Sequence, residues 1–541
     1  MSPKKKNFIV QAAILSVAGI LVRIIGLLYR NPLNAAITDV GYGYYQSAYA
    51  IYAMILLISS YSIPTAVSKV ISAKLALKEY KNAHRIFHVS LIYVVIVGGI
   101  AALITFIFAP VLIDRPGAVL ALRVLAPTIF FSGILGVFRG YFQAYNTMVQ
   151  TSISQIIEQI FNAVASIAAA YALIAAFASS NTNSISKYGA AGGAAGTGIG
   201  VLAGLLFMVL VYMLNRRIIL KKVYRDKTRK LDSYKDIFIV IFSMVTPVIL
   251  STFIYNISTA LDMTIFFKIA EQMPHMTKNL ADIQYGVFSG KYMILINVPV
   301  AIASALSSAV IPTVSSRFAL EDYEGASQKV GQALHFTMLI AIPSAIGLAV
   351  LAYPIMELLF PSKDTLALAA DMLTTGSISV IFYSMSTVSN GILQGIGKVT
   401  IPVRNAFIAL VIHVIALVAM LEYTDWGIYS LMLATILYSF LMCILNGISV
   451  RHHLQYRHDF GKLIIRPFIA AIVMGSAAFL TFYSIDTLIH SAKLALFPAI
   501  IVALPVYFVA IIKTGGINEE ELLNFPKGAT LLRISKRMHL L

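Results

Sequence analysis

Charged residues are scarce in this chain. Asp, Glu, Lys and Arg make up 12% of its 541 residues, whereas soluble domains carry about 25%. Apolar runs of about 20 residues, long enough to cross a bilayer as helices, recur from end to end. No segment between them is long or polar enough to form a separate soluble domain. The sequence therefore predicts an all-α polytopic membrane protein.

Cysteine is almost absent, and the histidines form no recognisable site. Cys443 is the single cysteine and falls within a predicted span, which excludes an intrachain disulfide. The ten histidines show no ligand spacing with cysteine or carboxylates. No polar loop is long enough to hold a catalytic site above the membrane. We therefore expect no enzyme, no metal and no other cofactor.

Fourteen apolar runs are candidate membrane spans. If the N-terminus, with Lys4, Lys5 and Lys6, is cytoplasmic, the even-numbered spans end in loops rich in Lys and Arg. The outer loops are then polar or acidic, as the positive-inside rule requires, and both termini are cytoplasmic. The net charge of +18 thus reflects topology and contact with anionic lipids, not nucleic-acid binding. The predicted spans are 8–29, 44–68, 87–113, 118–144, 150–178, 189–214, 237–267, 285–316, 331–360, 367–394, 402–421, 428–449, 467–490 and 495–512.

The chain contains an internal repeat. The segment "SIPTAVSK", Ser62–Lys69, ends the second predicted span, and "VIPTVSSR", Val310–Arg317, ends the eighth. Six spans separate the copies, so both have the same orientation, as in a parallel repeat. The basic segment between the lobes is either a helix on the membrane surface or simply a positive-inside anchor. The predicted domains are an N-lobe of helices 1–6 at 1–214, a basic cytoplasmic linker at 215–236, a C-lobe of helices 7–12 at 237–449, and helices 13–14 with a basic cytoplasmic tail at 450–541.

Glycine-rich stretches indicate helix packing. The segment "GGAAGTGIG", Gly192–Gly200, superficially resembles a dinucleotide-binding loop. That loop follows a β-strand, whereas this segment opens an apolar span, so we expect no nucleotide site. Gly136, Gly140 and Ala144 are spaced by four residues, which lets helices approach closely. We assign these small residues to packing.

Apart from Arg404 at the very start of the span 402–421, four basic residues lie inside predicted spans: Arg23, Arg123, Arg139 and Lys291. Such residues are costly in the bilayer and normally face a partner or a wet cavity. Arg123 lies near a span end, where its side chain can reach the outer interface. Asp262, in the seventh span, is either an ion or proton site or a partner for Lys291. The sequence alone does not choose between these alternatives.

Arg139 lies in the segment "ILGVFRGYFQAYN", and its best candidate partner is Glu158. The two residues flank one predicted turn at similar distances, which places them nearly level in a helical hairpin. The equivalent positions in the second copy are Asn390 and Ala409, so only the first lobe keeps these charges. This asymmetry favours a function for the first lobe beyond support of the fold.

These features resemble the multidrug/oligosaccharidyl-lipid/polysaccharide exporter superfamily. Two six-span lobes in parallel repeat are typical of it, and fourteen spans fit its polysaccharide-exporter and MurJ branches. The segment Arg23–Arg30 is similar to the first helix of the YtgP/SpoVB group. A second, later motif of that group resembles Arg139–Gln143 together with Ser154–Gln159. One departure is Gln150, where the group pattern has proline before Thr151.

The resemblance implies a flippase that moves an undecaprenyl-diphosphate-linked cell-wall precursor, chiefly lipid II, to the outer leaflet by alternating access. Arginine presents a planar fork of donors that suits phosphate. The expected partners are the lipid-linked substrate and anionic lipids of the bacterial cell membrane, without nucleic acid, and we expect a monomer. The expected diphosphate-binding residues of a cavity between the lobes are Arg23, Arg30, Arg139 and Lys291, with Glu158 and Asp262 as charge partners or coupling residues.

Three alternatives remain. The first is a flippase for another polysaccharide or teichuronic-type lipid-linked unit, which the sequence cannot separate from lipid II. The second is a cation-coupled multidrug exporter, for which the predicted cavity has too many basic residues. The third is a membrane scaffold without transport, against which the buried charges argue, because packing does not require them.

Overall fold

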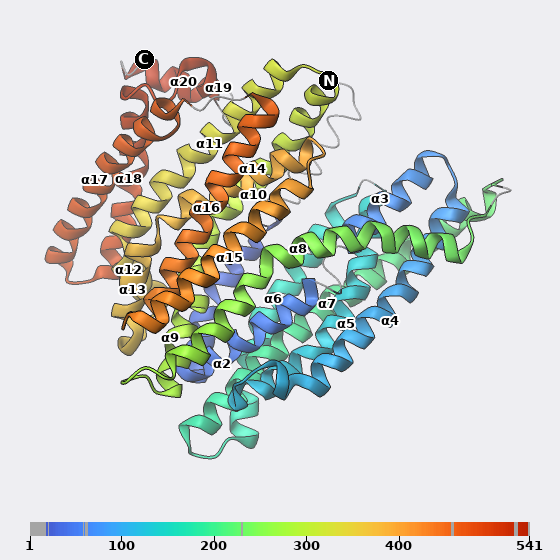
Figure 1. The fold of residues 1–541 in the computed structure, drawn as a ribbon, viewed down its shortest axis with the longest axis horizontal. Coiled ribbons are helices and arrows are strands. Elements are labelled where there is room, and N and C mark those ends of the chain that lie inside the picture. The colour runs from blue at the N-terminus through green and yellow to red at the C-terminus, as the bar shows by residue number, and fades with distance from the viewer. Residues whose placement is uncertain are drawn as a thin grey trace. The chain divides into compact units, whose positions relative to one another are not determined.

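The computed structural model describes residues 18–19, 21–57, 59, 63–145, 147–228, 231–455, 459–523 and 528–538, and the regular elements among them are helices. The chain divides into two compact units, Met1–Gly286 and Val287–Leu541 (Figure 1). The predicted lobe bounds rest on the sequence repeat, which compactness does not test, so they stay a prediction. The predicted all-α polytopic fold class is confirmed.

The first unit holds a short helical stretch at 21–28 and eight named elements. These are α2 (Arg30–Leu56), α3 (Ile63–Ala76), α4 (Tyr80–Leu112), α5 (Pro116–Ala144), α6 (Val149–Phe177), α7 (Thr182–Arg225), α8 (Tyr234–Ala270) and α9 (Lys278–Val287). The second unit begins with a π-helical turn. Its elements are η2 (Phe288–Tyr292), α10 (Met293–Ala319), α11 (Tyr323–Val350), α12 (Ala352–Leu359), α13 (Lys363–Gly376), α14 (Ser379–Gly395), α15 (Thr400–Tyr423), α16 (Ile428–Leu454), η3 (Gly461–Ile465), α17 (Arg466–Ile489), α18 (Ala492–Lys513), α19 (Glu519–Leu523) and α20 (Gly528–Arg537).

Within the described residues, ten helices are long and apolar enough to cross a membrane. The count is eleven if α13 and α14, which meet at a bend of 52°, form one span. These eleven coincide with predicted runs. The other three runs, 8–29, 44–68 and 237–267, contain residues that the structure leaves undescribed or describes by backbone alone. The total of fourteen spans therefore stays a prediction.

Helix α2 contains a kink at Thr38, where the backbone leaves the helical region with φ 70° and ψ 162°. Positive φ is rare for a β-branched residue. The Thr38 hydroxyl accepts a hydrogen bond from the Gly41 backbone N–H at 3.2 Å and lies 2.8 Å from the Ser186 hydroxyl. Thr38 thereby acts as an N-cap for the following stretch. Along the chain, the kink falls between Arg30 and the tyrosine-rich part of α2.

The glycines of α7 allow α6 to pack closely against it (Figure 1). A Cβ atom at Gly192 would overlap the Ala170 backbone, and one at Gly196 would overlap Ser166. The segment that superficially resembles a nucleotide loop therefore lies inside helix α7, where its glycines allow close packing. Gly140 has the same role on α5, because a Cβ atom there would come within 3.0 Å of Pro64 Cα.

We expect Gly196→Ala to destabilise the first unit by about 1–3 kcal/mol, the usual cost of overpacking. The matched control is Gly99→Ala on α4, where the nearest atom to an added Cβ is 3.8 Å away. Because alanine favours a helix over glycine, the control should unfold at the same temperature as the parent or slightly higher. Thermal unfolding of the purified proteins measures both. Equal unfolding temperatures for the two variants would rule out this packing role.

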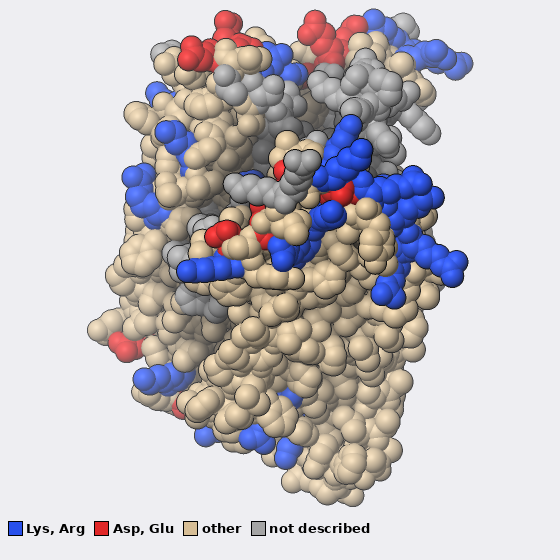
Figure 2. Space-filling model, turned by 90° about the vertical axis from the view of Figure 1, so that its right-hand side faces the viewer, with Lys and Arg blue, Asp and Glu red and all other residues tan. Residues whose placement is uncertain are grey.

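The basic linker predicted at 215–236 begins as a continuation of α7 and ends against the turn between α3 and α4. Lys74 Nζ lies 2.6 Å from Asp232 Oδ2, and the Lys81 backbone N–H donates to Asp226 Oδ2 at 2.7 Å. Burial disfavours the charge of Asp226, yet the hydrogen bonds it accepts hold its pKa below the ordinary value. Figure 2 shows Lys and Arg side chains gathered in the upper half of one face, above a broad area without charged side chains, with a few more near the lower edge. The last part of the linker is therefore fixed to the first unit.

Candidate functional site

Arg139 and Glu158 form the ion pair that the hairpin spacing predicted. Helices α5 and α6 place Arg139 Nη2 at 2.7 Å from Glu158 Oε2. Arg139 Nε also donates to the Ser154 hydroxyl at 2.9 Å. The side chains are 14% exposed for Arg139 and 28% for Glu158. The Nε and Nη2 groups on one edge of the guanidinium are therefore engaged, and the more accessible member of the pair is the acid.

Arg30 lies among tyrosines of α2, a feature that sequence reasoning missed. Its Nε donates to the Gly26 carbonyl at 3.1 Å, and its guanidinium lies within hydrogen-bonding reach of the Tyr42 hydroxyl. Successive tyrosine rings on one face of α2 have centroids 6.3, 6.0 and 5.5 Å apart. Their spacing of three and four residues is the signal that could have revealed them. The tyrosines are Tyr42, Tyr45, Tyr49 and Tyr52.

The tyrosines connect the two arginine sites electrostatically. The charges of Arg30 and Glu158 both act on the Tyr49 hydroxyl, and Glu158 also acts on Tyr52. With Arg139 included, the formal charges in this part of the first unit are two positive and one negative. Arginine and tyrosine together supply many hydrogen-bond donors. The arrangement suits a polyvalent anion.

Arg23 precedes Arg30 by seven residues, or two helical turns, so the two share a face of a nearly continuous helix. Its side chain is exposed. A Cβ atom at Gly26 would lie 3.1 Å from Gln159 Nε2, so this helix passes beside α6 close to Glu158. Arg23 therefore extends the row of basic groups toward the N-terminus.

Arg123 behaves as its position near a span end suggests. It lies on the same helix as Arg139 but is half-buried and engages a neighbouring helix. Its Nε donates to the Phe106 carbonyl at 3.3 Å, and its guanidinium carbon is 5.8 Å from the Phe106 ring centroid. Arg123 is separate in its contacts from the site around Glu158.

Asp262 and Lys291 belong to different units of the chain, Asp262 to the first and Lys291 to the second. Lys291, in η2, is 1% exposed, and its Nζ donates to the Thr365 hydroxyl at 2.6 Å. The Phe360 ring centroid is 5.9 Å from the same atom. Asp262 is buried in α8 near Tyr285. Their roles in substrate binding or coupling stay predictions.

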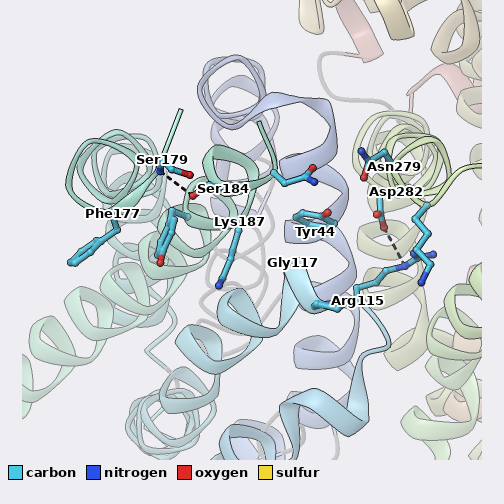
Figure 3. Close-up of a pocket in the computed structure, with 13 residues that line it drawn as sticks. Tyr44, Arg115, Gly117, Phe177, Ser179, Ser184, Lys187, Asn279 and Asp282 are labelled. Carbon is cyan, nitrogen blue, oxygen red and sulfur yellow. Dashed lines mark hydrogen bonds and ion pairs between the residues drawn. The ribbon is translucent and has the colours of Figure 1, made fainter. Parts of the chain in front are cut away.

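Arg115 is a further buried charge. It lies in the short segment between the predicted spans 87–113 and 118–144, and the sequence did not mark it as a candidate. It is 3% exposed at the start of α5, and its Nε lies 3.3 Å from Asp282 Oδ1 (Figure 3). Arg115 also forms an ion pair with Glu271, and its guanidinium carbon lies 3.8 Å from the Phe267 ring centroid. No local pattern marks this residue, because its partners come from α8 and α9, far along the chain.

Within the part of the chain that the structure describes, no three His, Cys, Asp or Glu side chains come together in a way that would hold a metal ion. The charged groups of the candidate site instead consist of arginines with a single acid. The chemistry that this set supports is reversible binding of an anion.

Two family models match the chain. The model described as "Polysaccharide biosynthesis protein" matches residues 9–318, more than half of the chain, and the MatE model matches residues 290–418. Similar proteins include "Lipid II flippase MurJ" of Bacillus subtilis (strain 168), 23% identical over 483 residues that cover 86% of this chain and 85% of that protein. "Stage V sporulation protein B" of the same organism is 22% identical over 480 residues, with coverage of 87% and 90%.

Solved structures share the fold. The structure titled "Lipid II flippase MurJ, inward closed conformation" aligns with a TM-score of 0.66 and 14% identity, covering 92% of this chain and 98% of that one. An inward-facing transporter of the multidrug resistance MATE family aligns with a TM-score of 0.60 and 15% identity, with coverage of 83% and 98%. Together with the apolar helices, these likenesses show a multi-pass membrane protein.

Proposed function

The chain belongs to the polysaccharide biosynthesis protein family, and on that premise we propose that it is a flippase for an undecaprenyl-diphosphate-linked cell-wall precursor. Lipid II is the proposed cargo, carried to the outer leaflet by alternating access. The observation that carries the proposal is the net positive polar region formed by Arg30, Arg139 and the tyrosines of α2 in the first unit. One relative that matches 86% of this chain is named "Lipid II flippase MurJ".

The diphosphate of the cargo supplies the charge that this region lacks. A guanidinium binds phosphate through two parallel N–H donors, which a lysine cannot reproduce. Arg30 and Arg139 are the proposed primary ligands. Arg23, which is exposed, is proposed to contact the diphosphate as it enters the site. Glu158 holds Arg139 in place when no cargo is bound. The cargo then competes with Glu158 for the guanidinium, which keeps binding reversible. Lys291 is the fourth proposed ligand. Its side chain is nearly fully buried and donates to the Thr365 hydroxyl.

A cation-coupled drug exporter fits these charges poorly. A site for cationic drugs needs net negative charge, whereas the region around Glu158 is net positive. The MatE model also matches only residues 290–418, outside the unit that holds these arginines. A related flippase for another polysaccharide or teichuronic-type unit remains the second candidate, because similarity to Stage V sporulation protein B covers as much of the chain as similarity to MurJ.

Binding by the purified chain in nanodiscs tests the proposal. Lipid II and undecaprenyl diphosphate should both bind, and undecaprenyl monophosphate should bind at least tenfold more weakly because it offers one phosphate fewer. Ethidium, a cationic drug, should not displace lipid II. Tight ethidium binding without lipid II binding would favour the exporter instead.

The proposed topology places both termini in the cytoplasm of a bacterial cell, with the protein as a monomer in contact with anionic lipids and without nucleic acid. In a Cys443→Ser background, Ser180→Cys should react with a membrane-impermeant maleimide in intact cells. Ser233→Cys should react only after the membrane is opened. Both serines are exposed, one before α7 and one at the start of α8. Equal labelling of the two variants in intact cells would overturn this topology.

A further inference from the structure

A pocket of about 520 Å³ lies in the first unit, away from the arginines around Glu158 (Figure 3). Its walls come from four separate stretches of the chain, which contribute Tyr44 of α2, Gly117 of α5, Lys187 of α7 and Lys278 of α9. All four follow odd-numbered predicted spans. The proposed topology therefore places the pocket at the outer face of the membrane. The volume lies within the range of about 300–1,000 Å³ typical of small-molecule sites.

The pocket is net positive. Three basic side chains line it, and Asp282 is the one acid in the lining. Asp282 and Glu271 both pair with Arg115, so these three groups together with Lys187 and Lys278 carry one net positive charge. Among the described residues, neither lysine forms an ion pair.

Three helices begin at this pocket and add to its positive field. They are α5 at Pro116, α7 at Thr182 and α9 at Lys278. Each helix start carries a partial charge of about +0.5 from its unpaired backbone N–H groups. The field falls off within the first turn. Pro116, Asn183 and Lys278 lie in these first turns, and Lys187 lies farther along α7. Helix α6 ends beside the pocket at Phe177 with the opposite partial charge. The helix starts thus reinforce the charge of the two lysines.

Hydroxyl and amide groups surround the lysines. Asn183, Ser184 and Asn279 offer both donors and acceptors, and the Tyr44 ring packs against the first turn of α5. Gly117 makes this possible, because a Cβ atom there would overlap the ring. Groups of this kind recognise hydroxylated ligands, with the ring as an apolar floor. Figure 3 shows the Lys187 side chain directed toward the start of α5 near Gly117.

We propose that this pocket is a binding site for a small hydroxylated anion, a phosphate or carboxylate carried on a sugar or glycerol unit. Lys187 and Lys278 bind the anionic group, and the amides and hydroxyls bind the ligand's hydroxyl groups. A glycerol phosphate of a lipid headgroup and an acidic sugar of a cell-wall polymer share this chemistry. The site is independent of lipid transport by the arginines, so its test does not depend on the proposed function.

Calorimetric titration of the purified full chain tests the site with glycerol 1-phosphate and N-acetylmuramic acid as probes. At least one should bind with a Kd in the low millimolar range or tighter, and added salt should weaken binding. The stronger probe identifies the source, a lipid headgroup for glycerol 1-phosphate and an acidic sugar for N-acetylmuramic acid. N-acetylglucosamine, which is neutral, should bind at least tenfold more weakly than the acidic sugar.

The double variant Lys187→Gln with Lys278→Gln should lose at least tenfold in affinity for the stronger probe. Its matched control is Lys363→Gln with Lys493→Gln, which removes the same charge from exposed positions outside the pocket. The control should bind like the parent. Absence of binding by both anionic probes would overturn the proposal, as would equal affinity in the two double variants.

Discussion

Arg139→Ala is expected to lower both the amount of protein in the membrane and its transport activity. The substitution removes two hydrogen bonds, to Ser154 and Glu158, and leaves a carboxylate inside the first unit without its partner. Breaking a buried pair from one side costs about 3–5 kcal/mol; because Glu158 is partly accessible, the lower end of that range applies. Immunoblotting of membranes and growth of a strain depleted of its lipid II flippase measure the two effects.

The double variant Arg139→Ala with Glu158→Ala separates support of the fold from substrate binding. Replacing both members of a buried pair is often neutral for stability, so the protein level should return. Growth should remain impaired, because the guanidinium is also proposed to bind the diphosphate. Arg123→Ala, on the same helix but bonded to the Phe106 carbonyl, is the matched control and should support growth. Full growth of the double variant at normal protein level would reduce Arg139 to a structural residue.

Arg30→Gln is expected to weaken lipid II binding by about tenfold to a hundredfold. This factor corresponds to the loss of one hydrogen bond to a charged group, which contributes about 1.5–3 kcal/mol. Arg30 has no carboxylate among its closest neighbours, which are the hydroxyls of α2 and the Gly26 carbonyl. Its loss therefore leaves no buried acid unpaired, and the protein level should stay near that of the parent. Binding in nanodiscs measures the effect directly.

Arg30→Lys is the informative companion, since it keeps the charge and loses the planar fork. It should bind lipid II more tightly than Arg30→Gln and less tightly than the parent. If Arg30→Gln binds lipid II as well as the parent, the diphosphate does not contact Arg30. The tyrosines around it would then serve packing alone.

The sequence predicted those contacts of the site that join residues close together along the chain. The Arg139–Glu158 pair followed from counting residues on either side of one turn, because helical rise fixes the level of both side chains. The packing role of Gly140 in α5 also followed from local spacing. The length of α7 did not, because hydropathy reports only the apolar part of a helix that runs on into polar residues at both ends.

The missed contacts join residues far apart in the chain. Arg115 meets Glu271 and Asp282, and Lys291 meets Thr365, through packing that no local pattern encodes. The family resemblance implied a cavity role for Lys291, which stays a prediction, and the structure shows this side chain nearly fully buried. The surroundings of Arg30 were within reach of sequence reasoning, since the tyrosine spacing on α2 follows the helical period.

Growth of a bacterial strain depleted of its lipid II flippase and supplied with this chain tests the central claim most directly. The account predicts that the parent chain restores growth and normal cell shape, and that Arg30→Gln fails to do so at an equal protein level. Failure of the parent chain at a normal membrane level, in a strain that another lipid II flippase rescues, would contradict lipid II as the cargo. Rescue by Arg30→Gln as full as by the parent would contradict the proposed diphosphate site.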